Sequence, residues 1–168
     1  MISQTVEYAL RAIVTIAQHG GDTCTSQQIS AITQVPAPYL SKLMQVLVRA
    51  DLVTSKRGLH GGFVLTKDVS DLTIWEIVDA VEPFRRIREC PLDIDSHTGS
   101  LCPLHRRLDD ALALVENSFR STTVKEMLSS QSSVTPLCEE RKLNQIMLNK
   151  SINKRPPTRK TTRKKNKP

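Results

Sequence analysis

Residues 25–65, TSQQISAITQVPAPYLSKLMQVLVRADLVTSKRGLHGGFVL, carry the strongest local signals for the fold of this chain. At its start, Thr25 and Gln28 form a capping-box pair ahead of Ile29, which predicts the beginning of a short helix. The four residues 33–36 then form a turn that ends in proline, short enough to set the following helix across the first. Two helices joined in this way indicate a helix-turn-helix.

A second helix is expected from about residue 37 to residue 49. Pro38 suits the first turn of a helix, where its missing N–H removes no hydrogen bond. Apolar residues then recur at i, i+3 and i+4, so one side of this helix is expected to be buried. The apolar stripe consists of Leu40, Leu43, Met44 and Leu47. The opposite face carries Pro38, Tyr39, Ser41, Lys42, Gln45 and Arg49.

The end of the stretch predicts a β-hairpin. Two short β-capable runs, 53–56 and 63–66, flank the glycine-rich sequence RGLHGG at 57–62. Glycine at such a tip allows both a tight turn and a close approach to a phosphate backbone. The polar residues at the tip are Lys56, Arg57 and His60.

Helical patterns continue on both sides of residues 25–65. Residues 3–19 repeat apolar side chains at helical spacing and run into two glycines, where the helix is expected to end. Thr73 and Glu76 form a second capping-box pair, ahead of a helix that Pro83 ends. Three helices followed by a glycine-tipped hairpin is the order of a winged helix-turn-helix.

The C-terminal half predicts a loop and then a long helix. Residues 84–102 have no clear periodicity, and from residue 103 it returns for about five turns. A last turn or two is expected at 123–128. The expected fold class is therefore mainly α with a small β wing: a winged helix-turn-helix plus a long C-terminal helix. The apolar face of the long helix consists of Leu104, Leu108, Ala111, Leu112, Val115 and Phe119.

Charge is unevenly distributed along the chain. The formal net charge is +7, yet nine Lys or Arg and no acidic residue lie in 150–168, which leaves 15 basic and 17 acidic groups before them. The basic character therefore belongs to a tail and not to the folded body. No run approaches the ~18 consecutive apolar residues of a membrane span. Glu7 and Arg11 interrupt what would be the apolar core of a signal peptide, so the sequence predicts a cytoplasmic protein without membrane contact.

The predicted second helix and the hairpin present side chains suited to DNA. Gln45 and Ser41 can hydrogen-bond base edges, whereas Lys42, Arg49 and Tyr39 suit phosphate contact. A small helical domain with solvated cations, or a protein-docking module, would share some of these features. The order, the spacing and the wing together favour DNA binding. An enzyme is not expected, because the chain has no nucleophile–base pair, phosphate loop or catalytic metal motif.

Five separated motifs make the sequence resemble the Rrf2 family of transcription regulators. The motifs are YALR at 8–11, YL at 39–40, RGxxGG at 57–62, TIxEIVxAV at 73–81 and CxxH at 102–105. The resemblance covers roughly residues 1–129. It implies a homodimer joined by the long helix, with each recognition helix and wing on one half of a palindromic operator in double-stranded DNA.

The resemblance also implies a cofactor. The best-known members of the family bind an iron–sulfur cluster in the loop before the long helix, through cysteines about six positions apart. A downstream histidine, or a carboxylate early in the first helix of the other subunit, completes the set. The matching residues here are Cys90, Cys102, His105 and Glu7. The middle cysteine is missing: Ser96 stands at its position, beside His97. A [2Fe–2S] cluster is favoured over [4Fe–4S].

This ligand set is chemically possible without the middle cysteine. Two cysteines and two nitrogens hold a two-iron cluster in Rieske centres, and Cys102 and His105 lie at i and i+3, so both can face one point. Three other interpretations stay open: Cys90 and Cys102 as a reversible thiol–disulfide pair, a zinc site, and a loop with no ligand. Glu7 can instead pair with Arg11 at i+4.

The predicted organisation has four parts. Residues 1–82 form the winged helix-turn-helix, 83–102 a cysteine-bearing sensor loop, 103–129 the dimerisation helix with a short following helix, and 130–168 a basic tail expected to be disordered. The favoured function is a sequence-specific DNA-binding regulator, acting as a repressor, whose DNA affinity is switched by an iron–sulfur cluster or by thiol redox state. The alternative is a non-specific architectural nucleic-acid-binding protein that uses its basic tail.

Overall fold

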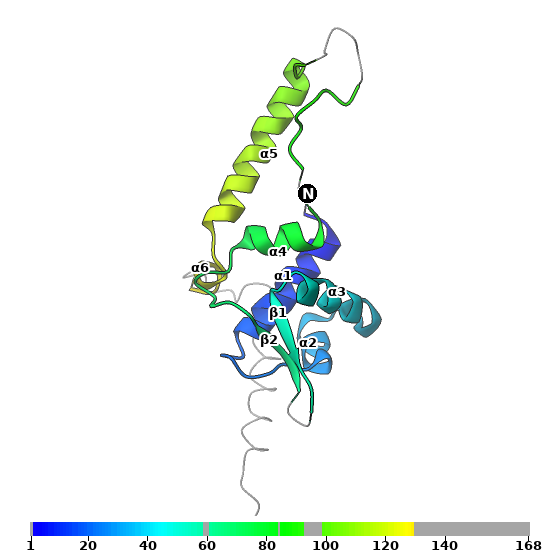
Figure 1. The fold of residues 1–168 in the computed structure, drawn as a ribbon, viewed down its shortest axis with the longest axis vertical. Coiled ribbons are helices and arrows are strands. Elements are labelled where there is room, and N and C mark those ends of the chain that lie inside the picture. The colour runs from blue at the N-terminus through cyan, green and yellow to red at the C-terminus, as the bar shows by residue number, and fades with distance from the viewer. Residues whose placement is uncertain (1, 59–60, 84, 93–98, 130–168) are drawn as a thin grey trace, which may run out of the picture.

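A computed structural model describes residues 2–58, 61–83, 85–92 and 99–129. Figure 1 shows two parts. One is a group of short helices with a two-stranded hairpin, and the other is a single long helix that extends away from it, with the cysteine-bearing loop at its far end. The predicted fold class, mainly helical with a small antiparallel wing, is confirmed.

The elements follow the order expected from the sequence. In chain order they are α1 (Gln4–Ala17), α2 (Ser26–Thr33), α3 (Ala37–Arg49), β1 (Val53–Lys56), β2 (Gly62–Leu65), α4 (Ile74–Val81), α5 (Pro103–Ser121) and α6 (Val124–Ser129). None of the helices in the described ranges has the length and apolar character needed to cross a membrane.

Both predicted capping boxes are present, and they fix where two helices begin. At α2 the Gln28 N–H donates to the Thr25 hydroxyl at 3.3 Å, and the Thr25 N–H donates to the Gln28 side-chain oxygen at 2.8 Å. The same reciprocal pair joins Thr73 and Glu76 at the start of α4. Such a cap contributes about 1 kcal/mol, so local sequence determines where these helices begin, while packing on the core supplies most of their stability.

The second strand begins one residue earlier than predicted, at Gly62. Gly62 belongs to the strand because it is the antiparallel partner of Lys56 in β1. A third segment lies beside the hairpin: the Cys24 N–H donates to the Phe63 carbonyl at 2.9 Å, and the Phe63 N–H donates back to the Cys24 carbonyl at 2.8 Å. A side chain on Gly62 would place its Cβ 2.8 Å from the Cys24 carbonyl oxygen. The hairpin is therefore attached directly to the loop between α1 and α2.

The core lies between α1, α3 and α4, and α6 closes it. Ile13, Leu40, Leu47 and Ile77 are fully buried there. Val124 of α6 is also fully buried, and its N–H donates to the Leu72 carbonyl at 2.8 Å. Helix α6, expected to follow the long helix as part of the same unit, packs back on the DNA-binding part. This packing is favourable because burying Val124 removes apolar surface from water.

Candidate DNA interface and metal centre

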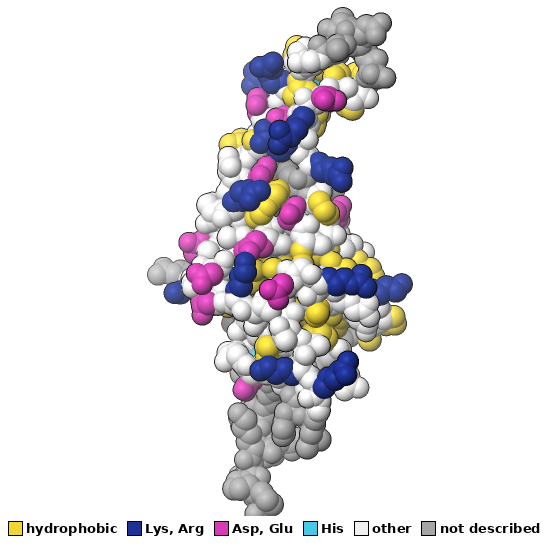
Figure 2. Space-filling view, viewed as in Figure 1, with side chains coloured by type: hydrophobic (Ala, Val, Ile, Leu, Met, Phe, Trp, Pro, Cys, Tyr) yellow, Lys and Arg dark blue, Asp and Glu magenta, His cyan; other side chains and the backbone are white. Residues whose placement is uncertain are grey.

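The exposed face of α3 carries the side chains predicted to contact DNA. Ser41, Lys42, Gln45 and Arg49 are all exposed, while the apolar stripe of the same helix is buried. The helix is fixed by that stripe, so its polar face has a defined direction. Figure 2 shows Lys and Arg side chains standing out from the surface around α3 and the hairpin.

The hairpin lies beside this face. Lys56 and Arg57 are exposed at its tip, and the predicted contact residue His60 lies outside the described residues. A side chain on Gly61 would place its Cβ 2.6 Å from the Lys56 carbonyl oxygen, so the turn requires glycine at that position. The structure therefore brings the two predicted cations near the recognition helix on a tightly turned tip.

A hollow of about 390 Å³ separates α3 from the hairpin. Its polar wall includes the predicted residues Ser41, Gln45 and Arg49, and Ser26 and Ser55 join them from α2 and β1. Sequence reasoning missed these two serines, because a serine at the start of a helix or within a strand carries no distinguishing local signal.

Tyr39 has a contact within the chain. Its hydroxyl shares a 2.6 Å hydrogen bond with the Thr5 hydroxyl, and its ring meets that of Tyr8 edge-on at a centroid distance of 5.5 Å. The predicted phosphate-contacting side chain therefore ties the start of α3 to α1, and it remains 38% exposed. Tyr8 and Tyr39, the tyrosines of the YALR and YL motifs, therefore contact each other.

Three of the four predicted metal ligands meet at the far end of α5. The His105 Nδ1 lies 3.1 Å from the Cys102 Sγ and 3.5 Å from the Cys90 Sγ. One donor atom from each residue falls within 4.8 Å of the other two. Cys102 is the N-cap residue of α5 and His105 lies in its first turn, which places both at the same point, as their i, i+3 spacing predicts.

The donor set is suited to a transition metal. Thiolates and a neutral imidazole nitrogen are the ligands that zinc and iron–sulfur clusters take from proteins. Both cysteines are half-buried, and His105 is only 9% exposed. The site is thus reachable from solvent on its cysteine side and enclosed on its histidine side.

Glu7, the fourth predicted ligand, lies on α1 and outside this three-residue group. Its carboxylate forms an ion pair with Arg11 one turn later, and Arg11 also donates to the Thr33 carbonyl at 3.3 Å. A role for Glu7 at the metal centre would need the second subunit. Ser96 and His97, on the loop, lie outside the described residues.

Ion pairs that sequence reasoning missed lie along α5, beginning one helical turn from the candidate metal site. Arg86 binds Asp109 of α5 through two hydrogen bonds of 2.6 Å each. Further along α5, Arg120 donates to Glu116 at 2.9 Å, and its guanidinium carbon lies 4.2 Å from the centre of the Trp75 ring on α4. Of these contacts, only the i, i+4 spacing of Glu116 and Arg120 was visible in the sequence.

Cys24 lies outside the candidate metal site and has a structural position. It is fully buried, and its Sγ lies 3.5 Å from the His19 Nε2. The His19 Nδ1 is 2.7 Å from the Thr15 carbonyl, which orients the ring. Cys24 packs where the hairpin joins the core.

Comparisons with known proteins agree on one family. Residues 2–130 match Rrf2, described as iron-dependent transcriptional regulator. A protein of Aquifex aeolicus (strain VF5), whose name places it among HTH-type transcriptional regulators, is 26% identical over 132 residues, covering 77% of this chain and 92% of that protein. The structure of CymR (YrzC), the global cysteine regulator of B. subtilis, has a TM-score of 0.65 at 26% identity and covers 79% of this chain and 98% of its own. T. potens IscR has the same TM-score at 25% identity, with 79% and 88% covered.

Proposed function

Because this chain belongs to the Rrf2 family of winged-helix transcriptional regulators, we propose that it binds operator DNA as a homodimer and that a cofactor held by its cysteine loop sets the DNA affinity. It is a DNA-binding transcriptional regulator and not an enzyme. The cofactor, the dimer and the repressor role are the proposal, and each has its own support in the described residues.

The observation that carries the proposal is the meeting of Cys90, Cys102 and His105. Two sulfurs and one imidazole nitrogen within 4.8 Å form an incomplete ligand set, and a metal centre commonly needs four. The family description names iron dependence, and an iron–sulfur cluster, when bound, would supply a redox-active centre at this point. A [2Fe–2S] cluster suits a mixed sulfur and nitrogen donor set.

The partner subunit's Glu7 is the proposed fourth ligand. Within one chain Glu7 pairs with Arg11, so this assignment requires its carboxylate to exchange that partner for the centre across the dimer. A carboxylate oxygen is a feasible ligand for iron beside thiolates. The proposal therefore makes the metal centre depend on the dimer.

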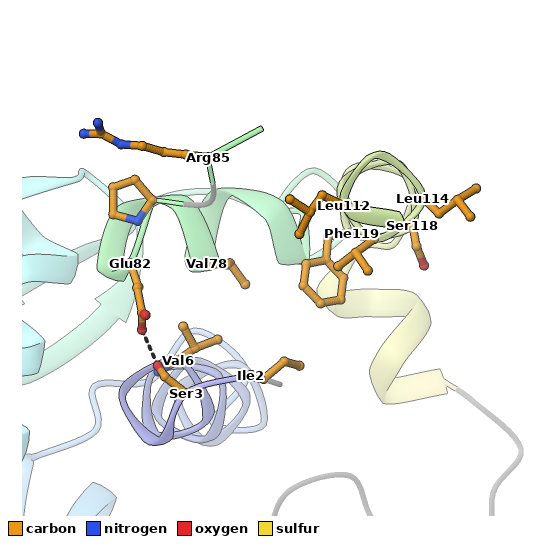
Figure 3. A pocket seen from close by; sticks show the side chains of 12 residues that line it. Ile2, Ser3, Val6, Val78, Glu82, Arg85, Leu112, Leu114, Ser118 and Phe119 are labelled. Atoms are coloured by element: carbon orange, nitrogen blue, oxygen red, sulfur yellow. Dashed lines mark hydrogen bonds between the residues drawn. The ribbon is translucent and has the colours of Figure 1, made fainter. Parts of the chain in front are cut away.

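The surface of α5 supports a dimer. Its predicted apolar face is left largely uncovered within one chain: Leu104 is 63% exposed, Leu108 46% and Val115 39%. Next to it, a groove of about 630 Å³ lies between α1, α4 and α5. In Figure 3, Val6 and Val78 face this groove from α1 and α4, and Phe119 faces it from α5. A long apolar helix face beside an apolar groove matches a helical subunit interface.

In the proposed complex the recognition helices and the wings contact different parts of the DNA. Gln45 and Ser41 read base edges in the major groove, and Lys42 and Arg49 contact phosphates on either side. Arg57 at the wing tip contacts the backbone or the minor groove. A twofold dimer would place two copies of this face on a palindromic operator, and binding there would block transcription.

The position of the metal centre explains how it could influence DNA binding. Cys90 follows α4, whereas Cys102 and His105 begin α5, so the centre joins the DNA-binding part to the proposed dimer helix. A change in the contacts among these three residues would therefore change the angle between the recognition helices of the two subunits. Such a rigid-body rotation would switch the affinity for DNA.

A thiol switch is a second candidate, favoured by one observation. The Cys90 and Cys102 sulfurs lie within 4.8 Å of each other, and both residues are half-buried. A peroxide or a disulfide could oxidise the pair, removing two protons and two electrons as the Cys90–Cys102 disulfide forms. Both candidates place the sensor at the same residues.

The deciding experiment is anaerobic purification followed by visible absorbance spectroscopy and by iron and sulfide assays. Cys90→Ala and Cys102→Ala should each lose the absorbance and the iron, whereas the control Cys24→Ala should keep both. Operator binding by loaded and unloaded protein then shows whether the cofactor sets affinity. Wild-type protein without iron, and with a Cys90–Cys102 disulfide after air exposure, would favour the thiol switch instead.

The architectural alternative is tested with the basic tail. We expect a chain ending at Asn149 to lose the same factor in affinity on operator and on scrambled DNA, because nine cations add affinity through counterion release without reading sequence. Binding should be compared at several salt concentrations. Uniform, strongly salt-dependent binding of the full-length chain to both DNAs would favour the architectural protein. Loss of operator preference on truncation would contradict the expected role of the tail.

A further inference from the structure

The segment that carries Cys90 is bound to α5 by a second set of contacts, one helical turn beyond the metal centre. The Arg86 Nε and Nη2 donate to the two carboxylate oxygens of Asp109, at 2.6 Å each. The backbone N–H of Ile87 donates to the same carboxylate at 2.9 Å. Three hydrogen bonds therefore converge on Asp109 from two consecutive residues of the loop.

The spacing of these contacts matches the spacing of the candidate ligands. Arg86 precedes Cys90 by four residues, and Asp109 follows His105 by four residues, which is one turn along the same face of α5. The loop segment therefore runs antiparallel to α5, with Arg86 at Asp109 and Cys90 at His105. The two contacts define one alignment of the segment on the helix.

This segment has no secondary structure of its own to hold it. Residues 85–92, all of which the structure describes, form neither helix nor strand. A cysteine on such a segment reaches its partners only if other contacts position the backbone. The contacts with Asp109 position the backbone at Arg86 and Ile87, three to four residues before Cys90.

The chemistry of the Arg86–Asp109 pair suits a fixed positioning contact. A bidentate guanidinium–carboxylate pair is directional as well as strong, because the planar fork matches the two oxygens. The Asp109 side chain is only 16% exposed. The hydrogen bonds from Arg86 hold the pKa of Asp109 below its ordinary value, so the carboxylate stays ionised at neutral pH.

We propose that Asp109 and Arg86 are positioning residues that hold Cys90 against Cys102 and His105, and so set how tightly the centre retains metal. The inference rests on the proposed metal centre and goes beyond it by naming the residues that align its ligands. Groups that orient metal ligands typically change affinity by about 10–100-fold when removed.

The test uses full-length protein, kept anaerobic and reduced, titrated with Co²⁺ alone and followed by its visible absorbance. Asp109→Asn should weaken Co²⁺ binding by about 10–100-fold. The matched control is Asp110→Asn, which makes the same charge change one residue along at an exposed position and should shift affinity less than about twofold. Arg86→Lys keeps the positive charge but loses the two parallel hydrogen bonds of the guanidinium. Its Co²⁺ affinity should therefore lie between those of Asp109→Asn and Asp110→Asn.

A metal-independent measurement checks the contact itself. The Ile87 amide should exchange with solvent deuterium faster in Asp109→Ala than in wild type, because its acceptor is removed. Arg86→Gln, a change outside the helix, serves as a second variant if changes in α5 lower the melting temperature.

The outcomes separate the two proposals. Wild-type protein that binds no Co²⁺ overturns the metal centre, and the positioning role with it. Wild-type protein that binds Co²⁺, with unchanged affinity in Asp109→Asn and Arg86→Gln while Ile87 exchange rises, overturns the positioning role alone. Weaker Co²⁺ binding in both variants but not in Asp110→Asn supports it.

Discussion

The two ends of this molecule are held together by different forces. Around α1, α3 and α4, buried aliphatic side chains form one continuous core, and side-chain caps start the helices. At the far end of α5, His105 is the one buried residue of that helix, and polar contacts hold the described part of the cysteine loop in place. DNA recognition thus rests on a rigid unit, whereas the proposed sensor loop is held by a few polar contacts that a ligand or an oxidant can alter.

The largest expected effect breaks the proposed dimer. Leu108→Asp places a charge on the apolar face of α5 in both subunits, so it should cost about 3 kcal/mol or more and raise the dimer dissociation constant roughly 100-fold. Sedimentation over a range of concentrations measures this constant. Asn117→Asp adds the same charge on the opposite side of α5 and should leave the dimer intact. Equal behaviour of the two variants would rule out this face as the interface.

The next effect sharpens the contrast in packing. Leu47→Ala removes a fully buried side chain and should lower the free energy of unfolding by about 2–5 kcal/mol. Leu92→Ala, at a position 58% exposed on the cysteine loop, should change it by less than about 0.5 kcal/mol. Chemical denaturation of both variants is the measurement. A large loss in Leu92→Ala would show that the loop packs on a partner in the dimer.

A smaller effect lies within the DNA-binding face. Gln45→Ala should relax the choice of base at particular positions by about 1–3 kcal/mol, because an amide on the recognition helix can pair with adenine. Arg57→Ala should weaken binding to all sequences alike, since a wing cation contacts backbone or minor groove. Selection from a randomised operator library distinguishes these outcomes. The same shift in both profiles would mean that the DNA-binding face is oriented differently.

The smallest effect concerns pH at the sensor end. The folded pKa of Asp109 lies below its ordinary value because Arg86 donates hydrogen bonds to it. Its ionised form therefore stabilises the fold above the unfolded pKa of about 3.9, and this contribution is lost as pH falls through the lower folded value. An NMR titration of the Asp109 carboxyl measures the shift. Arg86→Gln should move this pKa upward, and an unchanged value would remove Arg86 as its cause.

Prediction from the sequence worked best where the signal is local. Two helix starts were predicted from capping-box pairs, Thr25 with Gln28 and Thr73 with Glu76, and the structure has both. The bounds of α3 match because Pro38 and the apolar stripe act within a few residues of each other. The start of β2 was missed by one residue, because Gly62 enters the strand through its pairing with Lys56, and the register of a hairpin depends on the turn between its strands.

The candidate site divides in the same way. Cys102 and His105 share one helical turn, so their spacing alone predicted that they meet. Cys90 was assigned through resemblance to a family, and its approach to His105 depends on contacts at Asp109 that no local pattern reveals. Ion pairs between a loop and a helix have no sequence period, because the loop has no regular geometry.

The sequence predicted the order of the helices, the glycine-tipped wing, the polar face of α3 and the meeting of Cys102 and His105 on one helical turn. Periodicity, caps and glycine requirements act over a few residues, so the sequence expresses them directly. The tertiary structure decided the rest: α6 returns to the core through Val124, Cys24 anchors the wing, and Arg86 with Asp109 brings Cys90 to its partners. These features depend on contacts between residues far apart in the sequence. Burial and charge pairing select such contacts only when the chain folds, so no local pattern reveals them.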